Sequence, residues 1–175
     1  MKNEDYNSFV PMMKRVENFK LFYQRENTEI LFGFFYGSDY PLHRYKAAKN
    51  LPEDRPLKPE DFNVEDYLDD CERLFEIHEA CGGDFIWSAS AFWGIPWLEA
   101  ALGCPIYADH ATGSIRSEIP DDFSKTLSIP TFDMESPWIK KTGEFLEAMA
   151  ERSKGRWPIG TTRMRGISDL LSALY

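Results

Sequence analysis

The amino-acid sequence predicts an α/β fold in which a parallel sheet is linked by helical crossovers. Segments with helical and strand-like patterns alternate along the chain in the order helix, strand, helix, strand, helix, strand, helix. This alternation is typical of crossover units around a parallel sheet. The candidate strands are continuously apolar, as strands covered by helices on both faces are. The length of 175 residues fits a single domain or a piece of a larger one.

The first helix and strand are expected before residue 40. The stretch "PMMKRVENFKLFYQREN" has apolar residues at helical spacing, and Pro11 suits the first turn of a helix. The predicted buried stripe comprises Met12, Val16, Phe19, Phe22 and Tyr23. The run "EILFGFFYG", residues 29–37, has the length of a strand, and it predicts a strand buried on both faces.

A long surface connection at 37–63 precedes the second helix and strand. The stretch "NVEDYLDDCERLFEIHEACGG" predicts a helix with Asn63 as its N-cap and with Gly82 and Gly83 at its end. The run "DFIWSAS", residues 84–90, is the second candidate strand. Long connections often carry functional residues, so the loop at 37–63 is of interest for a binding site.

The remaining elements follow the same alternation. A short helix and an extended piece are expected in "IPWLEAALGCPIY", and a loop in "PDDFSKTLSIPTFD". A third helix is expected in "SPWIKKTGEFLEAMAERSKG", with Ser136 as its N-cap, Pro137 at its start and Gly155 at its end. The third strand is expected in "WPIGT", and a last helix from about Gly166.

Three strands do not complete either common parallel architecture. An open doubly wound sheet usually carries five or six strands, and a closed eight-unit barrel needs about 250 residues. The last helical pattern also stops at Leu174 and Tyr175 while it still presents apolar residues. Two interpretations follow from the pattern alone: part of a larger barrel, or a small α/β domain with further strands around "CPIYAD" or "SIRSEI".

The charge and cysteine content exclude several classes of partner. With 20 basic and 29 acidic residues the net charge is −9, which argues against a nucleic-acid or anionic-membrane surface. No apolar run approaches the roughly 20 residues that span a bilayer, and the polar start "MKNEDYNSF" does not indicate a signal peptide. Three cysteines are too few and odd in number for a disulfide framework, and free thiols fit the cytoplasm.

Three stretches resemble the uroporphyrinogen decarboxylase-like family, a superfamily that includes cobalamin-dependent methyltransferases. The stretch "GGDFIWSASAFWGIPWLEAALGCPI" is similar to the second strand of that family and the segment after it, and "WPIGTTRMRGISDLLSALY" is similar to its third-strand segment. The stretch "KRVENFKLFYQRENTEILFGFF" matches its opening helix and first strand in pattern. The resemblance covers nearly all of residues 1–175. It implies a partial (β/α)8 TIM barrel, about the first three β/α units with an N-terminal helix.

In such barrels the site lies at the carboxyl ends of the strands and in the loops after them. Three groups of polar or aromatic residues qualify: Tyr36, Ser38, Asp39 and Tyr40; Asp84, Trp87 and Ser88; and Thr161, Thr162, Arg163 and Arg165. The resemblance implies that Asp84 is catalytic, accepting hydrogen bonds from pyrrole N–H groups and stabilising the cation formed when a ring carbon is protonated. The alternative from the residues alone is that Asp84 caps a turn at the start of its strand.

The candidate substrate-binding residues are Tyr36, Trp87, Ser88, Arg163 and Arg165. Arg163 and Arg165 follow the third strand and suit a carboxylate or phosphate clamp, with pairing to one of the 29 acids as the alternative. The chain departs from the family after the first strand. Decarboxylases acting on uroporphyrinogen carry arginines there for the many carboxylates of the substrate, whereas this chain has "FFYGSDYPLHRY", with Asp39 at that place and Arg44 further on.

Three functions therefore stay open. The first is a uroporphyrinogen decarboxylase-like protein that decarboxylates a tetrapyrrole or catalyses a related reaction, incomplete and inactive as this chain alone. The second is a corrinoid-dependent methyltransferase, with a methyl donor and a corrinoid protein as partners. The third is a noncatalytic tetrapyrrole-binding or assembly module, which associates as a homo-oligomer or with a missing C-terminal half.

No resident metal or cofactor is expected. The zinc motif of the methyltransferases lies in the second half of their barrel and is absent from residues 1–175. His78 and Cys81 are three residues apart on a predicted helix, with Cys71 seven residues before His78. Packing within the helix explains all three, since cysteine is commonly buried.

Overall fold

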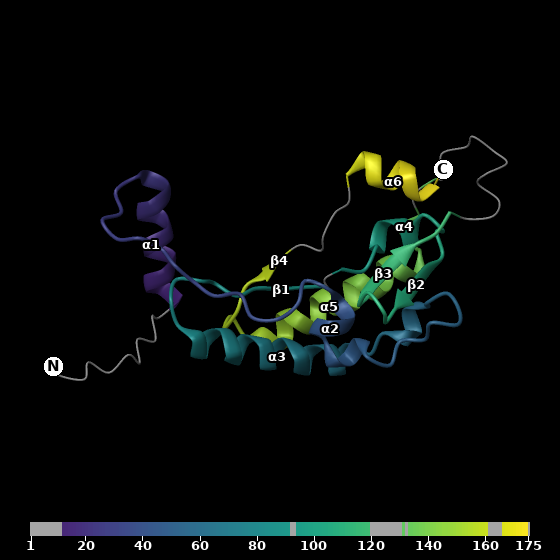
Figure 1. Ribbon diagram of the computed structural model, residues 1–175, viewed down its shortest axis with the longest axis horizontal. Helices are drawn as coiled ribbons and strands as arrows, with labels where there is room; N and C mark the ends of the chain where they lie inside the picture. Colours follow the sequence, from purple (N-terminus) through teal and green to yellow (C-terminus); the bar gives the residue numbers. More distant parts are fainter. Residues whose placement is uncertain (1–11, 92–93, 120–130, 132, 161–165, 175) are drawn as a thin grey trace.

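The computed structural model describes residues 12–91, 94–119, 131, 133–160 and 166–174 (Figure 1). The helices and strands, in chain order, are α1 Met12–Gln24, α2 Pro41–Arg44, η1 Lys46–Ala48, η2 Pro59–Asp61, α3 Val64–Cys81, β1 Ala89–Ser90, α4 Trp97–Ala101, β2 Ile106–Asp109, β3 Ser114–Ser117, α5 Pro137–Ser153, β4 Ile159–Gly160 and α6 Ile167–Leu174. Both helices and strands are present, which confirms the α/β class as mixed helix and strand content. The described residues form two small sheets and no closed barrel.

The two long helices begin and end where the sequence predicts. The Asn63 side chain accepts a hydrogen bond from the backbone N–H of Asp66 at 3.3 Å, which satisfies one of the free donors at the start of α3. Gly82 follows α3 with φ of 71°, a conformation that favours glycine. Helix α5 has Ser136 at its N-cap position and Pro137 at its first residue.

The main core lies between α3 and α5, which run side by side beneath the β1–β4 pair in Figure 1. Tyr67 of α3 and Phe145 of α5 are fully buried, and their ring centroids are 5.2 Å apart. Trp87 and Trp157 meet edge to face at 5.6 Å, just before the two parallel strands. Aromatic side chains bury large apolar areas, so these contacts account for much of the stability of this layer.

Two of the three predicted strands are neighbours and parallel. Ala89 pairs with Ile159, and Ser90 pairs with Gly160, in a sheet of two strands. The chain between them carries α5, as a crossover between parallel strands requires. The regular part of each strand is only two residues long, shorter than the runs 84–90 and 157–161 predict.

A second sheet forms at the positions where one of the two interpretations of the sequence allows further strands. Strands β2 and β3 pair in an antiparallel hairpin, with Ile106 opposite Ser117 and Asp109 opposite Ser114. Side chains of β2 alternate between buried and half-buried, which is the pattern of a sheet with one covered face. These are the positions of "CPIYAD" and "SIRSEI", but the hairpin is separate from the β1–β4 pair.

The prediction of a buried strand at residues 29–37 is wrong. The only bridge in this segment among the described residues joins Gly33 to Gly83, and it is antiparallel. Ile30 is 89% exposed, Phe32 60% and Phe34 59%. The apolar run is therefore uncovered on at least one face, since the described part of the chain provides no layer over it. The expectation of three parallel strands side by side fails for this segment.

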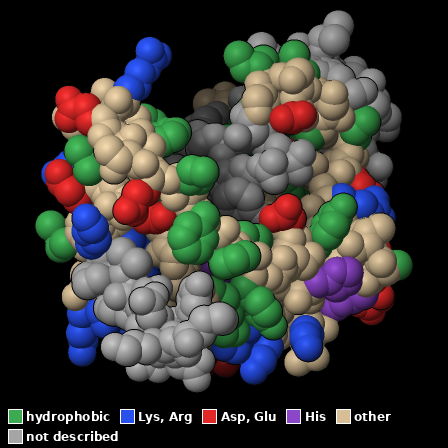
Figure 2. Space-filling model, turned by 60° about the vertical axis from the view of Figure 1, so that its left-hand side comes forward, with side chains coloured by type: hydrophobic (Ala, Val, Ile, Leu, Met, Phe, Trp, Pro, Cys, Tyr) green, Lys and Arg blue, Asp and Glu red, His purple; other side chains and the backbone are tan. Residues whose placement is uncertain are grey.

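Helix α1 is present, but its buried residue is not an apolar one. Arg15 is completely buried, whereas Phe22 is 48% exposed and Tyr23 is 80% exposed. In the predicted apolar stripe of α1, Met12, Val16 and Phe19 are half-buried, and only Phe22 and Tyr23 are exposed. Figure 2 brings the α1 end of the molecule forward and shows hydrophobic side chains on the surface, interspersed with acidic and basic ones. The fully buried contact of α1 is thus an ion pair, between Arg15 and Glu79, and not an apolar one.

The last helix is confirmed at Ile167–Leu174 and packs near α4. Ala173 and Leu174 are buried against Cys104, whose thiol donates to the carbonyl oxygen of Ala173 at 3.4 Å. The three cysteines are free, with Cys71 and Cys104 buried and Cys81 exposed. The predicted loop around 120–133 lies mostly outside the described residues.

Candidate functional site

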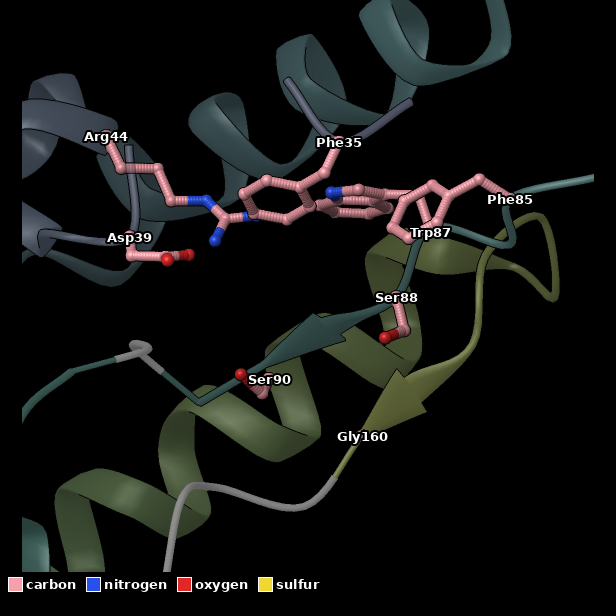
Figure 3. A pocket seen from close by; sticks show the side chains of 8 residues that line it. All are labelled: Phe35, Asp39, Arg44, Phe85, Trp87, Ser88, Ser90 and Gly160. Atoms are coloured by element: carbon pink, nitrogen blue, oxygen red, sulfur yellow. The ribbon is translucent and has the colours of Figure 1, made fainter. Parts of the chain in front are cut away.

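A pocket opens where β1 and β4 end. Its cavity volume is about 340 Å³, within the range of small-molecule sites. It is lined by Phe35, Asp39, Arg44, Phe85, Trp87, Ser88, Ser90 and Gly160 (Figure 3). Ser90 and Gly160 are the last residues of the paired strands. Asp39 and Arg44 come from the connection at 37–63, and Phe35 comes from the apolar run at 29–37. The lining combines three aromatic side chains with two charged ones and two serine hydroxyls.

Arg44 is positioned by the short helix α2. Its backbone N–H donates to Tyr40 O at 3.0 Å, and Pro41 begins the turn. The guanidinium carbon lies 4.5 Å from the centre of the Phe35 ring and 5.7 Å from that of Tyr45. A guanidinium over an aromatic face is attracted by the ring quadrupole. Figure 3 shows Arg44 extended toward Phe35 along one wall, with Asp39 projecting beside it.

Trp87 forms part of the same wall and is buried to 97%, since only 3% of it is exposed. Its indole packs against Trp157 at 5.6 Å, Phe75 at 6.1 Å and His78 at 6.2 Å. The indole Nε1 has no hydrogen-bond partner in the described part of the chain. A buried donor without an acceptor is costly, so this nitrogen marks a place where a ligand atom would be stabilised.

His78 supports the pocket from behind, a role the sequence analysis does not assign to it. The ring is buried between Phe35 at 5.7 Å and Phe85 at 5.3 Å. Its Nδ1 contacts the carbonyl oxygen of Leu74 at 2.6 Å, and its Nε2 accepts the backbone N–H of Tyr36 at 3.0 Å. Burial lowers the pKa of His78. The neutral ring with its proton on Nδ1 satisfies both contacts.

The predicted residues Ser88 and Trp87 both line the pocket, and Tyr36 does not. Tyr36 is 50% exposed, and its contribution is the backbone bond to His78. Ser88 is exposed on the wall formed by β1 and β4, as Figure 3 shows. Arg163 and Arg165, with Thr161 and Thr162, lie outside the described residues.

Asp84 lies in a different place from Trp87 and Ser88. Its Oδ1 accepts from the Asn18 side chain at 2.7 Å, and its Oδ2 accepts from the backbone N–H of Phe32 at 3.2 Å. It lines a second pocket of about 350 Å³, between α1 and residues 27–32. Asp84 therefore joins three parts of the chain at the start of its strand, which is the arrangement of a structural carboxylate.

Arg44 lines the pocket, although the sequence analysis assigns it no role. The signal is its position after the run at 29–37, within a connection that follows a predicted strand. The contact with Phe35 could not be read from spacing because it depends on how residues 36–43 turn back. Among the described residues, no group of three or more His, Cys, Asp and Glu side chains is arranged to hold a metal ion.

The chain matches no family model, no curated protein and no solved structure in the three comparisons made. Of the helices that the structure describes, none has the length and apolar character needed to cross a membrane.

Proposed function

We propose that this chain is part of a uroporphyrinogen decarboxylase-like (β/α)8 barrel, and that the pocket lined by Phe35, Arg44, Trp87, Ser88 and Ser90 is its substrate site. The observation that carries the proposal is the place of the pocket. It includes the last residues of two parallel strands, Ser90 and Gly160. Barrels of this class build their sites at the carboxyl ends of the strands.

The connection between the two strands supports the barrel arrangement. Strands β1 and β4 are parallel and joined through α5, as successive barrel units are.

In this proposal the residues that bind and orient the substrate are those of the pocket, and Asp84 is not one of them. The carboxylate of Asp84 is engaged by Asn18 and Phe32 and lines the other cavity. The pocket supplies a cation, an aromatic wall and the hydroxyls of Ser88 and Ser90. Such a set binds and orients a small molecule with an acidic group, as decarboxylation or a related reaction of that superfamily requires.

The test is a search for ligands by NMR with ¹⁵N-labelled protein and a panel of ring-containing small molecules that includes uroporphyrin. We expect shift changes to gather at Phe35, Ser88, Ser90 and Gly160. Ser88→Phe fills the pocket and should abolish them, whereas Ser168→Phe places the same side chain on the exposed surface of α6 and should not. Shifts that gather elsewhere, or none with any compound, contradict the proposal.

A noncatalytic assembly module is the second candidate, favoured by the exposed run at 29–37. Ile30, Phe32 and Phe34 are each more than half exposed, and one bridge pairs the segment. An unpaired, apolar edge favours pairing with another chain. Light scattering after gel filtration tests this function: a dimer that Phe34→Ser converts to monomer supports it, and a compact monomer at all concentrations counts against it.

A further inference from the structure

Most of the described arginines of this acidic protein form ion pairs with carboxylates. Those that form ion pairs are Arg15, Arg55, Arg73, Arg116, Arg152 and Arg156. Among the described arginines, Arg25 and Arg44 have no carboxylate within ion-pair distance. Arg25 is exposed at the end of α1, whereas Arg44 is half-buried at the pocket. An unpaired guanidinium in an apolar wall is a ready partner for an anion.

Two buried donors without a hydrogen-bond partner belong to residues that line the pocket. Arg44 Nε is buried and has no hydrogen-bond partner in the described part of the chain, and the same holds for Trp87 Nε1. Both residues line the pocket together with Phe35, on which Arg44 is stacked at 4.5 Å. Two buried donors beside an aromatic surface favour a ligand that has both a charged acceptor and an apolar body.

The volume of the pocket limits the size of that body. An engineered cavity of about 150 Å³ is enough to bind benzene. The pocket, at about 340 Å³, therefore has room for one ring with substituents. A tetrapyrrole has four rings and, in uroporphyrinogen, eight carboxylates, which is more than this cavity holds.

Asp39 limits the charge of the ligand. It lines the same pocket and projects beside Arg44 in Figure 3, without forming an ion pair with it. A second carboxylate on the ligand would approach Asp39, and like charges at close range oppose binding. Among the residues that line the pocket, Arg44 is the one cation, so the wall offers a partner to one ligand carboxylate and none to a second.

We propose that the pocket binds a compact monocarboxylate with a ring-sized apolar body, whose carboxylate accepts from Arg44 and the Trp87 indole while its ring packs along Phe35. This inference rests on the proposed function, which places the substrate site in this pocket. It differs in the expected substrate, which is a smaller acid and not a polycarboxylate tetrapyrrole. It goes beyond the family resemblance, because Arg44, which supplies the positive charge, lies outside the three stretches that carry the resemblance.

The test compares benzoate with its neutral counterpart benzamide by titration calorimetry, with the ¹⁵N-indole resonance of Trp87 as a local probe. That resonance is identified by its loss in Trp87→Phe. We expect benzoate to bind at least tenfold more tightly than benzamide and to shift the Trp87 indole signal. Arg44→Gln should remove this preference, and Arg25→Gln, which alters the other unpaired arginine, should leave it unchanged.

Charge selectivity is checked with the dicarboxylate phthalate. Phthalate should bind at least tenfold more weakly than benzoate. Asp39→Asn should reduce this difference in affinity, because it removes the negative charge that opposes the second carboxylate. Equal affinities for benzoate and benzamide would contradict the inference that the ligand is a monocarboxylate. Tight binding of uroporphyrin in the pocket would contradict it too. Neither result would contradict the proposal that the pocket is the substrate site. If none of the probes shifts a resonance of the pocket, both the inference and the proposed function are wrong.

Discussion

Arg15 of α1 and Glu79 of α3 form a two-point ion pair across 64 positions of sequence, with nitrogen–oxygen distances of 2.5 and 3.2 Å. The Arg15 side chain is fully buried and also donates to the carbonyl oxygen of Phe85 at 3.1 Å. No apolar residue of α1 is fully buried, so this pair is a principal contact that fixes the helix to the rest of the molecule.

Breaking that pair should destabilise the protein strongly. Arg15→Met leaves Glu79 without its cation, and removing one partner of a buried pair costs about 3 kcal/mol. Urea unfolding followed by circular dichroism measures the change. Glu17→Gln breaks the exposed pair with Lys20 and serves as the control, with an effect below about 0.5 kcal/mol. Equal effects of the two variants would show that α1 is not held in this way.

Asp84 is expected to act on stability. Asp84→Asn replaces one of its two accepting oxygens by a donor, so one bond to Asn18 or Phe32 is lost, at a cost of about 1–2 kcal/mol. Asp54→Asn, at an exposed aspartate, should change stability by less than about 0.5 kcal/mol. An Asp84→Asn protein as stable as the unaltered chain would remove the structural role and return Asp84 to the list of catalytic candidates.

The buried His78 predicts a loss of stability on mild acidification. Burial lowers its pKa in the folded state, so below the unfolded-state value of about 6.5 the unfolded chain binds more protons. The contribution of the neutral ring is complete above that pH and is lost as the pH falls through the folded-state pKa. Protonation also removes the acceptor for the Tyr36 N–H.

Urea midpoints at pH 5, 6 and 7 measure this effect. His78→Gln keeps an acceptor without titrating in this range, so its midpoint should vary less with pH. His43→Gln, at an exposed histidine, should behave like the unaltered protein. Identical pH profiles for all three proteins would refute the assignment.

The thiols should differ in reactivity because of burial. Burial raises the pKa of Cys71 to about 12 and that of Cys104 to about 11, while Cys81 is exposed. The thiolate is the reactive form, so iodoacetamide at pH 8 should modify Cys81 alone in the folded protein and all three cysteines in denaturant. Mass spectrometry counts the labels. Rapid native labelling of Cys71 would contradict the core packing of α3.

The contact between residues 29–37 and the start of the next segment can be tested at Gly33. A Cβ at this position would lie 2.5 Å from Phe85 Cβ and 2.9 Å from Phe85 N, so Gly33→Ala should destabilise the fold by about 1–3 kcal/mol. Gly143 of α5 has open space, and Gly143→Ala should raise stability by about 1 kcal/mol. A neutral Gly33→Ala would mean that the two segments do not touch in solution.

Local signals explain what the sequence predicts correctly. Helices α3 and α5 follow from caps and from apolar spacing, which act within a few residues. The buried face of an element depends instead on what packs against it. The run at 29–37 is apolar enough for a buried strand, yet the described structure leaves Ile30 and Phe34 exposed. For the same reason the burial of Arg15, which needs Glu79, gives no local signal.

The sequence predicts part of the site. It places Trp87 and Ser88 at a strand end, and both line the pocket. It groups Asp84 with them, but an extended chain rises about 3.3 Å per residue, so Asp84 lies up to about 20 Å from Ser90, the last residue of the strand at the pocket. The position of Arg44 against Phe35 depends on the turn at residues 36–43, and the sequence of that turn does not determine its geometry.

Residues 22–30 are exposed, whereas α1 is anchored by Arg15 and Asn18. The backbone could therefore be cut in the exposed stretch while α1 stays in place. A protease that cleaves after Arg25 would cut a solvent-facing stretch without removing either anchor. The N-terminal fragment would then stay bound to the remainder as a nicked complex. Two separately produced fragments divided there would reconstitute the fold when mixed, so the covalent link at this point serves to raise local concentration rather than to define the structure.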